Sequence, residues 1–243
     1  NAQNDGHRAY FTKYIKDELG DKVDELLPKV LPTYPPFGKR MLMDNGWYRM
    51  LRNPKVRLVS ERIREITADG VLDDTGEHHA ADVIVIATGF DVLRFLTAFE
   101  AHGRSGRSLR ELWGDDDARA YLGCAMPDFP NFFVLYGPNL QAGHGGSLIF
   151  MIEMQMRYIL SLLRQMSAQG IGAVECRQDV HDAYNDDVDR AHANMVWTHE
   201  GMATYYRNSR GRIVVNSPYL NSTYFNMSRE ARLDEYLAEP RRA

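Results

Sequence analysis

Two adjacent cations, Lys39 and Arg40, follow a segment that contains three prolines and ends in a glycine. Because proline fixes one backbone dihedral, the segment Leu31–Gly38 is predicted to be extended and stiff. A guanidinium keeps its charge and can fork onto a pair of oxygens, whereas an ammonium suits a phosphate as a point charge. The pair is therefore a candidate anion site. A solvated basic pair would have the same spacing, so the residues alone leave both interpretations open.

The loop Gly137–Ser147, of sequence GPNLQAGHGGS, is the most informative local feature. Its four glycines and one proline precede a segment with helical apolar spacing, so the free N–H groups of that helix's first turn point into the loop. Compact domains seldom keep such a loop beside a core helix without using it, although a flexible connector has a similar composition. His144 is either a ligand-facing group or an ordinary loop histidine.

The segment Asp82–Phe90 reads DVIVIATGF, with five consecutive apolar residues of which four are β-branched. This run predicts a strand that is buried on both faces, as in a parallel sheet beneath helices. Thr88 and Gly89 then fall at the carboxyl edge, where open α/β sheets place their ligands. Gly89 lacks a Cβ and would permit close approach of a flat ligand. By itself the run indicates only an α/β protein.

Other catalytic chemistry finds no support in the sequence. The pair His78-His79 lies in a turn without acidic or cysteine neighbours at ligand spacing, so a metal site is rejected. Cys124 and Cys176 are far apart and fit no metal or redox spacing, which is typical of buried thiols in a reducing compartment. There is no serine-hydrolase elbow, zincin motif, P-loop or G-x-G-x-x-G fingerprint.

The composition limits the partners. The 243 residues are 44% hydrophobic and carry a formal net charge of −4, without the basic surplus that nucleic acid or anionic lipid would require. No apolar run is long enough to cross a bilayer, and a cytoplasmic location is expected. The chain begins with Asn and shows no signal peptide, so we expect it to start partway through a longer gene product.

The elements that must position these residues are predicted from periodicity. Helices are expected at His7–Leu19, Lys22–Leu27 (stopped by Pro28), Asp44–Arg52, Ser147–Gly170, Asp179–Met195 and the chain's end. Besides Asp82–Ala87, strands are expected at Lys55–Ser60, Arg62–Thr67, Asn131–Tyr136, Ala173–Cys176 and Ile213–Val215, with a turn at Asp73–Glu77. The predicted class is α/β.

Five motifs in order carry a resemblance to a known family, and a sixth, the last one below, strengthens its closer match. They are PPFGKR (Pro35–Arg40), DNGWY (Asp44–Tyr48), DVIVIATGFD (Asp82–Asp91), YLG (Tyr121–Gly123), FPNFFVLYGP (Phe129–Pro138) and WTHEGMATYYRN (Trp197–Asn208). Together they resemble the C-terminal half of Baeyer–Villiger flavin monooxygenases, and most closely the 4-hydroxyacetophenone type.

The resemblance implies an incomplete Rossmann-like fold with two dinucleotide-binding domains, of which the C-terminal portion is present. It divides the chain into a helical segment and proline-rich linker over residues 1–38, the remainder of an NADPH-binding domain over residues 39–87, and the C-terminal part of an FAD-binding domain over residues 88–243. The family's glycine fingerprints are expected upstream. Their absence leads us to expect that this chain alone is inactive and binds no FAD.

The resemblance also implies roles for individual residues. Arg40 matches the arginine that stabilises the anionic oxygen of the peroxyflavin and its ketone adduct, and Lys39 the residue that contacts the 2′-phosphate of NADPH. The turn before the FAD domain and the loop that lines the flavin complete the expected cofactor-binding set: Lys39, Thr88, Gly89, Phe90, Asp91, Gly137, Gln141 and His144.

The implied reaction uses FAD, NADPH and O2. NADPH reduces FAD, O2 forms a C4a-peroxyflavin, and its attack on a ketone or aromatic ketone ends in an ester or lactone. Two alternatives remain: a flavin N- or S-oxygenase, and a non-catalytic nucleotide-binding or interaction module. Uncovered apolar faces would also favour a homodimer.

Overall fold

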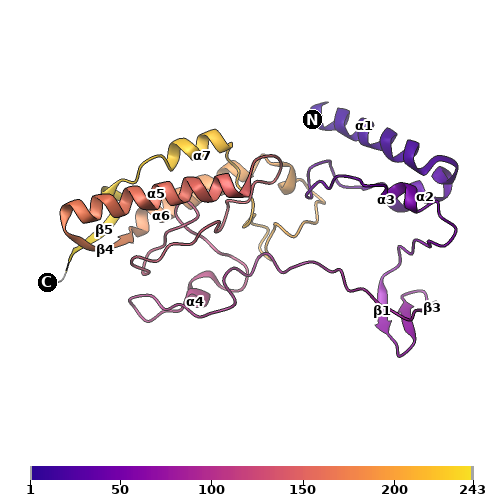
Figure 1. Cartoon of the computed structure of the whole chain (residues 1–243), viewed down its shortest axis with the longest axis horizontal. Helices are drawn as coiled ribbons and strands as arrows, with labels where there is room; N and C mark the ends of the chain where they lie inside the picture. The colour runs from indigo at the N-terminus through magenta and orange to yellow at the C-terminus, as the bar shows by residue number, and fades with distance from the viewer. Residues whose placement is uncertain (1, 242–243) are drawn as a thin grey trace. The chain divides into compact units, whose positions relative to one another are not determined.

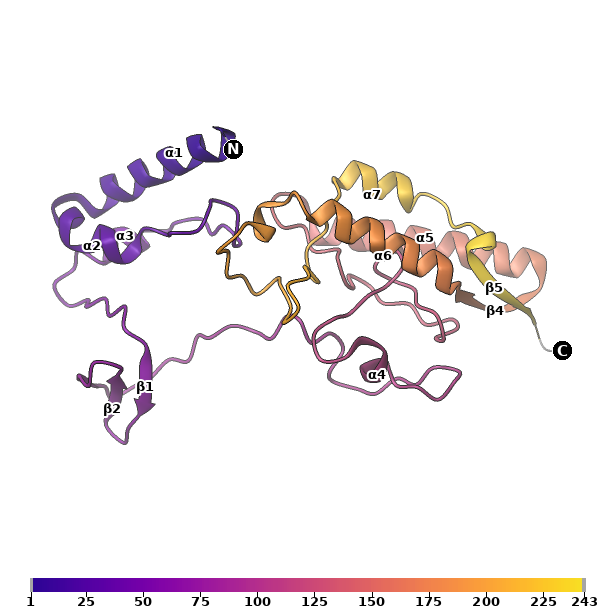
Figure 2. The same cartoon turned by 180° about the vertical axis from the view of Figure 1, so that it is seen from behind.

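A computed structural model describes residues 2–241 and divides them into two compact units. The first unit comprises the chain up to Pro36 together with Leu42–Phe90, and the second comprises Phe37–Met41 together with the chain from Asp91 onward. Figures 1 and 2 show the elements of both units from opposite sides. The short segment Phe37–Met41, which carries Lys39 and Arg40, thus belongs to the unit that also holds the glycine-rich loop.

The first unit begins with helices. Helix α1 (Ala2–Leu19) contacts α2 (Val23–Val30) and α3 (Trp47–Met50), with the 3-10 turn η1 (Gly20–Lys22) between α1 and α2. Their apolar faces meet in a small core of Ile15, Leu19, Leu26 and Leu51. The predicted stop at Pro28 is wrong, because α2 runs through this proline to Val30. Proline removes only its own N–H bond, and Leu31 N still donates to Leu27 O at 2.9 Å beyond it.

A three-stranded antiparallel meander follows. Strands β1 (Ile63–Ile66), β2 (Gly70–Asp73) and β3 (His78–Ala80) pair in that order, and the predicted turn at Asp73–Glu77 joins the last two. The Asp73 side chain accepts from Thr75 N at 2.9 Å and from Glu77 N at 3.0 Å, which fixes the turn. The strand predicted at Lys55–Ser60 is wrong, because this segment is a loop.

The prediction of a buried strand at Asp82–Ala87 is also wrong for the described residues. The segment is unpaired, and Val83, Val85 and Ile86 are 78%, 83% and 74% exposed. A hydrophobic run forms a buried strand only where neighbouring strands supply inter-strand hydrogen bonds and helices cover the faces of the sheet. No strand of the described residues pairs with this segment. Thr88, Gly89 and Phe90 lie at its exposed end.

The second unit is built around one long helix. Helix α5 (Leu148–Gln169) begins where the Ser147 hydroxyl accepts from Phe150 N at 3.3 Å and ends at Gly170, whose φ is 65°. This confirms the predicted bounds. The antiparallel pair β4 (Ile171–Cys176) and β5 (Tyr236–Pro240) lies at the far end of α5 in both views (Figures 1 and 2), and α6 (Gln178–His192) follows β4. Their shared core includes Tyr158, Leu162, Val174 and Tyr236.

Shorter elements complete the second unit. They are α4 (Leu109–Trp113), η2 (Val196–Thr198), α7 (Asn221–Met227) and η3 (Leu233–Glu235). The strands predicted at Asn131–Tyr136 and Ile213–Val215 are wrong, because both segments are loops that use isolated bonds such as Val134 N to Cys124 O at 2.9 Å. Ile213–Val215 is buried, whereas only Val134 is buried in the other segment. The chain's last element is β5 and not the predicted helix. The mixture of helices and strands is α/β, but both sheets of the described residues are antiparallel.

Candidate functional site

The structure brings Arg40 and the glycine-rich loop together. They line a cavity of about 250 Å³ within the second unit. Its lining residues are Phe37, Arg40, Met41, Tyr136, Ala142, Gly143, His144, Gly145, Gly146 and Leu148. Arg40 is exposed, and burial raises the pKa of Tyr136 while the Arg40 charge opposes the rise. The predicted catalytic cation therefore lies at a cavity that the predicted ligand-facing loop encloses.

The loop needs its glycines for two different reasons. A Cβ on Gly143 would lie 2.9 Å from Cζ3 of Trp197, so this position is closed by packing. Gly145 has a φ of 71°, and a Cβ there would meet nothing within 4 Å. Such a backbone conformation is rarely adopted by residues with a side chain. Beyond it, Leu148, Ile149 and Phe150 at the start of α5 are 47%, 61% and 41% exposed. The loop thus presents bare backbone and an apolar helix start.

His144 connects the loop to the Arg40 segment. Its Nε2 donates to the carbonyl oxygen of Phe37 at 2.6 Å, and its ring meets the Phe37 ring edge-on at 4.8 Å. Because a carbonyl can only accept, this bond places a hydrogen on Nε2. His144 lines the cavity, where the sequence analysis expected a ligand-facing residue. It also holds the Phe37 backbone through this hydrogen bond.

Two other predicted cofactor-binding residues hold the base of the loop. Gly137 is buried, and a Cβ on it would lie 2.4 Å from the carbonyl oxygen of Gly123. The Gln141 backbone donates to Val215 O at 3.0 Å and accepts from Ser217 N at 2.9 Å. These contacts fix where the loop starts. Neither residue is among those that line the cavity.

The remaining predicted residues are not brought to this cavity. Thr88, Gly89 and Phe90 belong to the first unit and are exposed, with Phe90 at 93%. Asp91 is the residue at which the second unit resumes, and it is also exposed. Lys39 is partly buried next to Arg40 without lining the cavity.

A buried network that the sequence did not reveal lies in the same unit. The Arg212 guanidinium is 9% exposed and reaches Asp189 at 2.8 Å and Asp117 at 3.2 Å. It also donates to Asn139 Oδ1 at 2.7 Å. Burial lowers the pKa of Arg212, and the two carboxylates oppose that effect. These bonds connect a residue before the glycine-rich loop (Asp117), one within it (Asn139) and two after it (Asp189 and Arg212). The members of the network are up to 95 residues apart, so no spacing could have identified it.

His192 extends this network toward the loop. Its Nε2 donates to Asn216 O at 3.0 Å, and its Nδ1 accepts from the Trp197 indole at 2.9 Å. Burial lowers the pKa of His192 to about 4, so the ring is neutral near pH 7. Trp197 in turn packs on Gly143. The motif Trp197–Asn208 was visible in the sequence, but its spacing gave no indication that Trp197 packs against the glycine-rich loop.

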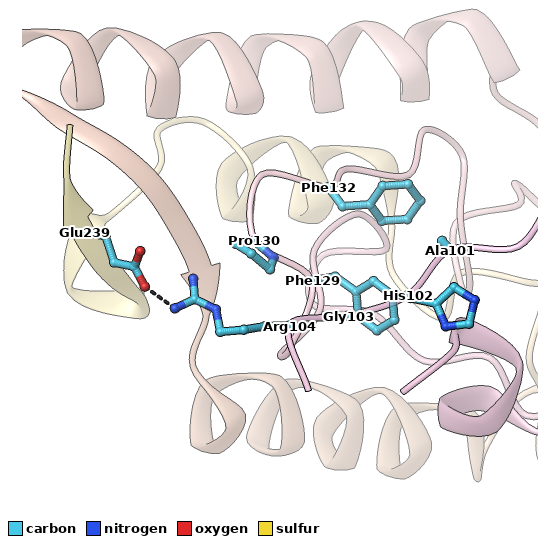
Figure 3. Close-up of a pocket in the computed structure, with 8 residues that line it drawn as sticks. All are labelled: Ala101, His102, Gly103, Arg104, Phe129, Pro130, Phe132 and Glu239. Carbon is cyan, nitrogen blue, oxygen red and sulfur yellow. Dashed lines mark hydrogen bonds and ion pairs between the residues drawn. The ribbon is translucent and has the colours of Figure 1, made fainter. Parts of the chain in front are cut away.

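Another cavity, of about 680 Å³, lies elsewhere in the second unit (Figure 3). Phe129, Pro130 and Phe132 lie along it, and Arg104 is hydrogen-bonded to Glu239 at one end. Arg104 also lies 3.5 Å from Glu175, so two carboxylates neutralise its charge. None of the predicted site residues lines this cavity. It therefore offers no chemistry that the sequence anticipated.

The rejected histidine pair has acidic neighbours after all. Asp73, Glu77 and His79 have ligand atoms within 4.8 Å of one another, although the sequence spacing suggested none. Their contacts are already used, because His79 Nε2 lies 2.9 Å from Asp73 Oδ2 and Glu77 pairs with Arg57 at 2.8 Å. The cluster is accounted for by the β2–β3 turn.

Known proteins with similar sequences are monooxygenases. The chain is 49% identical over 240 residues to the uncharacterized monooxygenase y4iD of Sinorhizobium fredii, which covers 99% of the chain and 36% of that protein. It is 34% identical over 194 residues to a Baeyer–Villiger monooxygenase of Pseudomonas aeruginosa, covering 80% of the chain and 36% of that protein. No model of a protein family matches the chain.

The structure is also similar to that of a monooxygenase. Cyclohexanone monooxygenase from Rhodococcus sp. Phi1 bound to NADP+ superposes with a TM-score of 0.85 at 26% identity, covering 99% of the chain and 46% of that enzyme. The chain is thus similar to one part of Baeyer–Villiger and other FAD-binding monooxygenases. It spans 36% of the two sequence relatives and 46% of the solved structure. This confirms the predicted class, a partial α/β portion of a flavoprotein with two dinucleotide-binding domains.

No helix of residues 2–241 combines the length and apolar character needed to cross a membrane. The two cysteines, Cys124 and Cys176, are buried and unbonded, and burial raises the pKa of Cys124 to about 12.

Proposed function

We propose that the full-length protein carrying this chain uses FAD, NADPH and O2 to insert one oxygen atom next to a ketone carbonyl, giving an ester or lactone. The observation that carries the proposal is the cavity that joins Arg40 to the glycine-rich loop. The similarity to Baeyer–Villiger monooxygenases supports it.

The cavity's residues fit one end of a flavin. The bare backbone at Gly145 and the exposed apolar residues Leu148 and Ile149 suit a flat ring with an apolar face and polar edges. The chain offers no glycine fingerprint for the pyrophosphate. When bound, FAD supplies the activation of O2, and the protein positions the reactants. We therefore propose that this chain alone turns over no ketone and binds FAD weakly at most.

Arg40 supplies the fixed positive charge. Oxygen insertion next to a carbonyl develops negative charge on oxygen, and a cation held at that place stabilises the transition state more than the ground state. The guanidinium is always protonated at neutral pH, so it adds charge without exchanging a proton. Lys39, its neighbour, is proposed to bind the 2′-phosphate of NADPH.

The substrate is proposed to be a ketone with an aromatic or apolar body, as in the 4-hydroxyacetophenone type. Met41, Tyr136 and Leu148 supply apolar surface around Arg40, and the phenol of Tyr136 supplies one polar contact. The two alternative functions would use the same cavity in different ways. A flavin N- or S-oxygenase would use the cavity without depending strongly on Arg40, and a binding module would not turn over.

The test replaces Arg40 in the full-length protein. Arg40→Ala is expected to lower kcat for ketone oxygenation by about 10²–10³-fold, the usual cost of removing one group that stabilises a developing oxyanion. Oxygenation of an organic sulfide by the same variant is expected to fall much less. Arg210→Ala, at an arginine whose side chain is 74% exposed, is the matched control. Oxygenation of the sulfide but not of the ketone by the wild-type protein, at a rate that Arg40→Ala leaves almost unchanged, would favour the N- or S-oxygenase.

A further inference from the structure

The backbone next to Arg40 has an unusual conformation. Phe37 has a φ of 66°, in the left-handed region that a residue with a bulky side chain rarely adopts. Gly38, which follows it, is buried. Such a conformation persists only where surrounding contacts hold it, and it commonly occurs at functional sites. The direction in which the chain leaves Phe37 determines where Arg40 lies, three residues later.

The contact that holds Phe37 comes from His144. The imidazole Nε2 donates to the Phe37 carbonyl at 2.6 Å, and the two rings meet edge-on at 4.8 Å with an interplanar angle of 72°. Both the backbone and the side chain of Phe37 are thus held by one residue. Arg40 also lies near the buried phenol of Tyr206, because its charge and backbone N–H oppose the rise that burial causes in the pKa of Tyr206.

His144 is itself supported from the core. The Trp197 ring lies 6.2 Å from the imidazole and close enough to Gly143 that no Cβ fits there. His192 fixes the Trp197 indole at 2.9 Å and is fixed by Asn216 O at 3.0 Å. A continuous series of contacts therefore runs from the buried network through Trp197 and His144 to the Arg40 segment.

We propose that His144 is the positioning residue of Arg40, which it places by holding Phe37 in its left-handed conformation. The proposal rests on the proposed function for its catalytic consequence, but its structural part is independent of catalysis. In this role His144 contacts Phe37 of the protein itself, and the role does not require contact with a cofactor.

The experiment compares three variants of the full-length protein by hydrogen–deuterium exchange and by steady-state kinetics. His144→Leu removes the donor, and His144→Gln keeps an N–H donor on a side chain of similar reach. The control is His102→Leu, because His102 is also exposed and contacts a backbone carbonyl, that of Gly106 at 3.1 Å, in a different loop. Since His144 is exposed, its replacement opens no core cavity.

His144→Leu is expected to speed exchange of the Gly38–Met41 amides about three- to tenfold, the range that one hydrogen bond confers. His144→Gln is expected to stay within about twofold of the wild-type protein, and His102→Leu to leave these amides unchanged. Unchanged exchange in His144→Leu would overturn the proposal, whether or not the protein oxygenates ketones.

The kinetic arm tests whether His144 acts through Arg40. With the native Arg40, His144→Leu is expected to lower kcat about three- to tenfold with little change in KM for the ketone. In an Arg40→Ala background the same change is expected to cost less than about twofold, because the group it positions is gone. Equal losses in both backgrounds would contradict the proposal. Absence of ketone turnover in the wild-type protein would refute the proposed function and leave the exchange result to decide the positioning role.

Discussion

Arg212→Met tests whether the buried network holds the second unit together. The substitution keeps a long apolar stem but removes the guanidinium that reaches Asp189, Asp117 and Asn139. The two carboxylates would remain with side chains only 34% and 17% exposed, Asp189 would keep Arg119 at 2.9 Å, and Asn139 Oδ1 would lose its donor. Removing one partner of a buried ion pair costs about 3–5 kcal/mol, and the partial exposure of Asp189 places the expected loss near the lower end, about 3 kcal/mol.

The matched control is Arg210→Met. Arg210 also approaches Asp117, at 3.7 Å, but its side chain is 74% exposed, compared with 9% for Arg212. Surface ion pairs contribute about 0–1 kcal/mol, so this variant is expected to unfold almost like the wild type. The assay is urea-induced unfolding followed by tryptophan fluorescence, to which the buried Trp113 and Trp197 contribute. Losses that agree within about 1 kcal/mol for the two variants would refute the assigned importance of the buried network.

Two further predictions concern pH and cofactor choice. Burial lowers the pKa of His192 from 6.5 to about 4, so below pH 6.5 the unfolded chain binds a proton that the folded chain does not. Stability is therefore expected to fall by up to about 3 kcal/mol as the pH drops from 6.5 to 4. His192→Gln should show a flatter pH dependence, and an equally steep one would contradict the assignment. Lys39→Ala in the full-length protein is expected to raise KM for NADPH about tenfold or more and to leave KM for NADH almost unchanged. A parallel rise in both constants would show that Lys39 does not recognise the 2′-phosphate.

Local signals in the sequence were reliable where one segment contains its own partners. Ser147 and Gly170 mark the two ends of α5 because a hydroxyl caps its start and a left-handed residue ends it. The turn at Asp73–Glu77 followed from side chains that bond to their own backbone. The glycine-rich loop was also identified from a local signal, because four glycines and one proline directly precede the helix.

Burial and distant contacts were not predictable in this way. The run Asp82–Ala87 has the composition of a buried strand, yet among the described residues nothing pairs with it, because composition cannot provide a neighbouring strand. The bonds of Arg212 to Asp117 and Asn139 span 95 and 73 residues, and the contact of His144 with Phe37 spans 107. These pairings depend on how the unit folds, and a single sequence carries no record of them.

The central claim is tested most directly by supplying the full-length protein with NADPH, FAD, an aromatic ketone and ¹⁸O-labelled O2. We expect an ester that carries one labelled oxygen atom, formed at an appreciable rate only with the native Arg40, and no product from this chain alone. Consumption of NADPH without labelled ester, or labelled ester at an undiminished rate in Arg40→Ala, would contradict the claim.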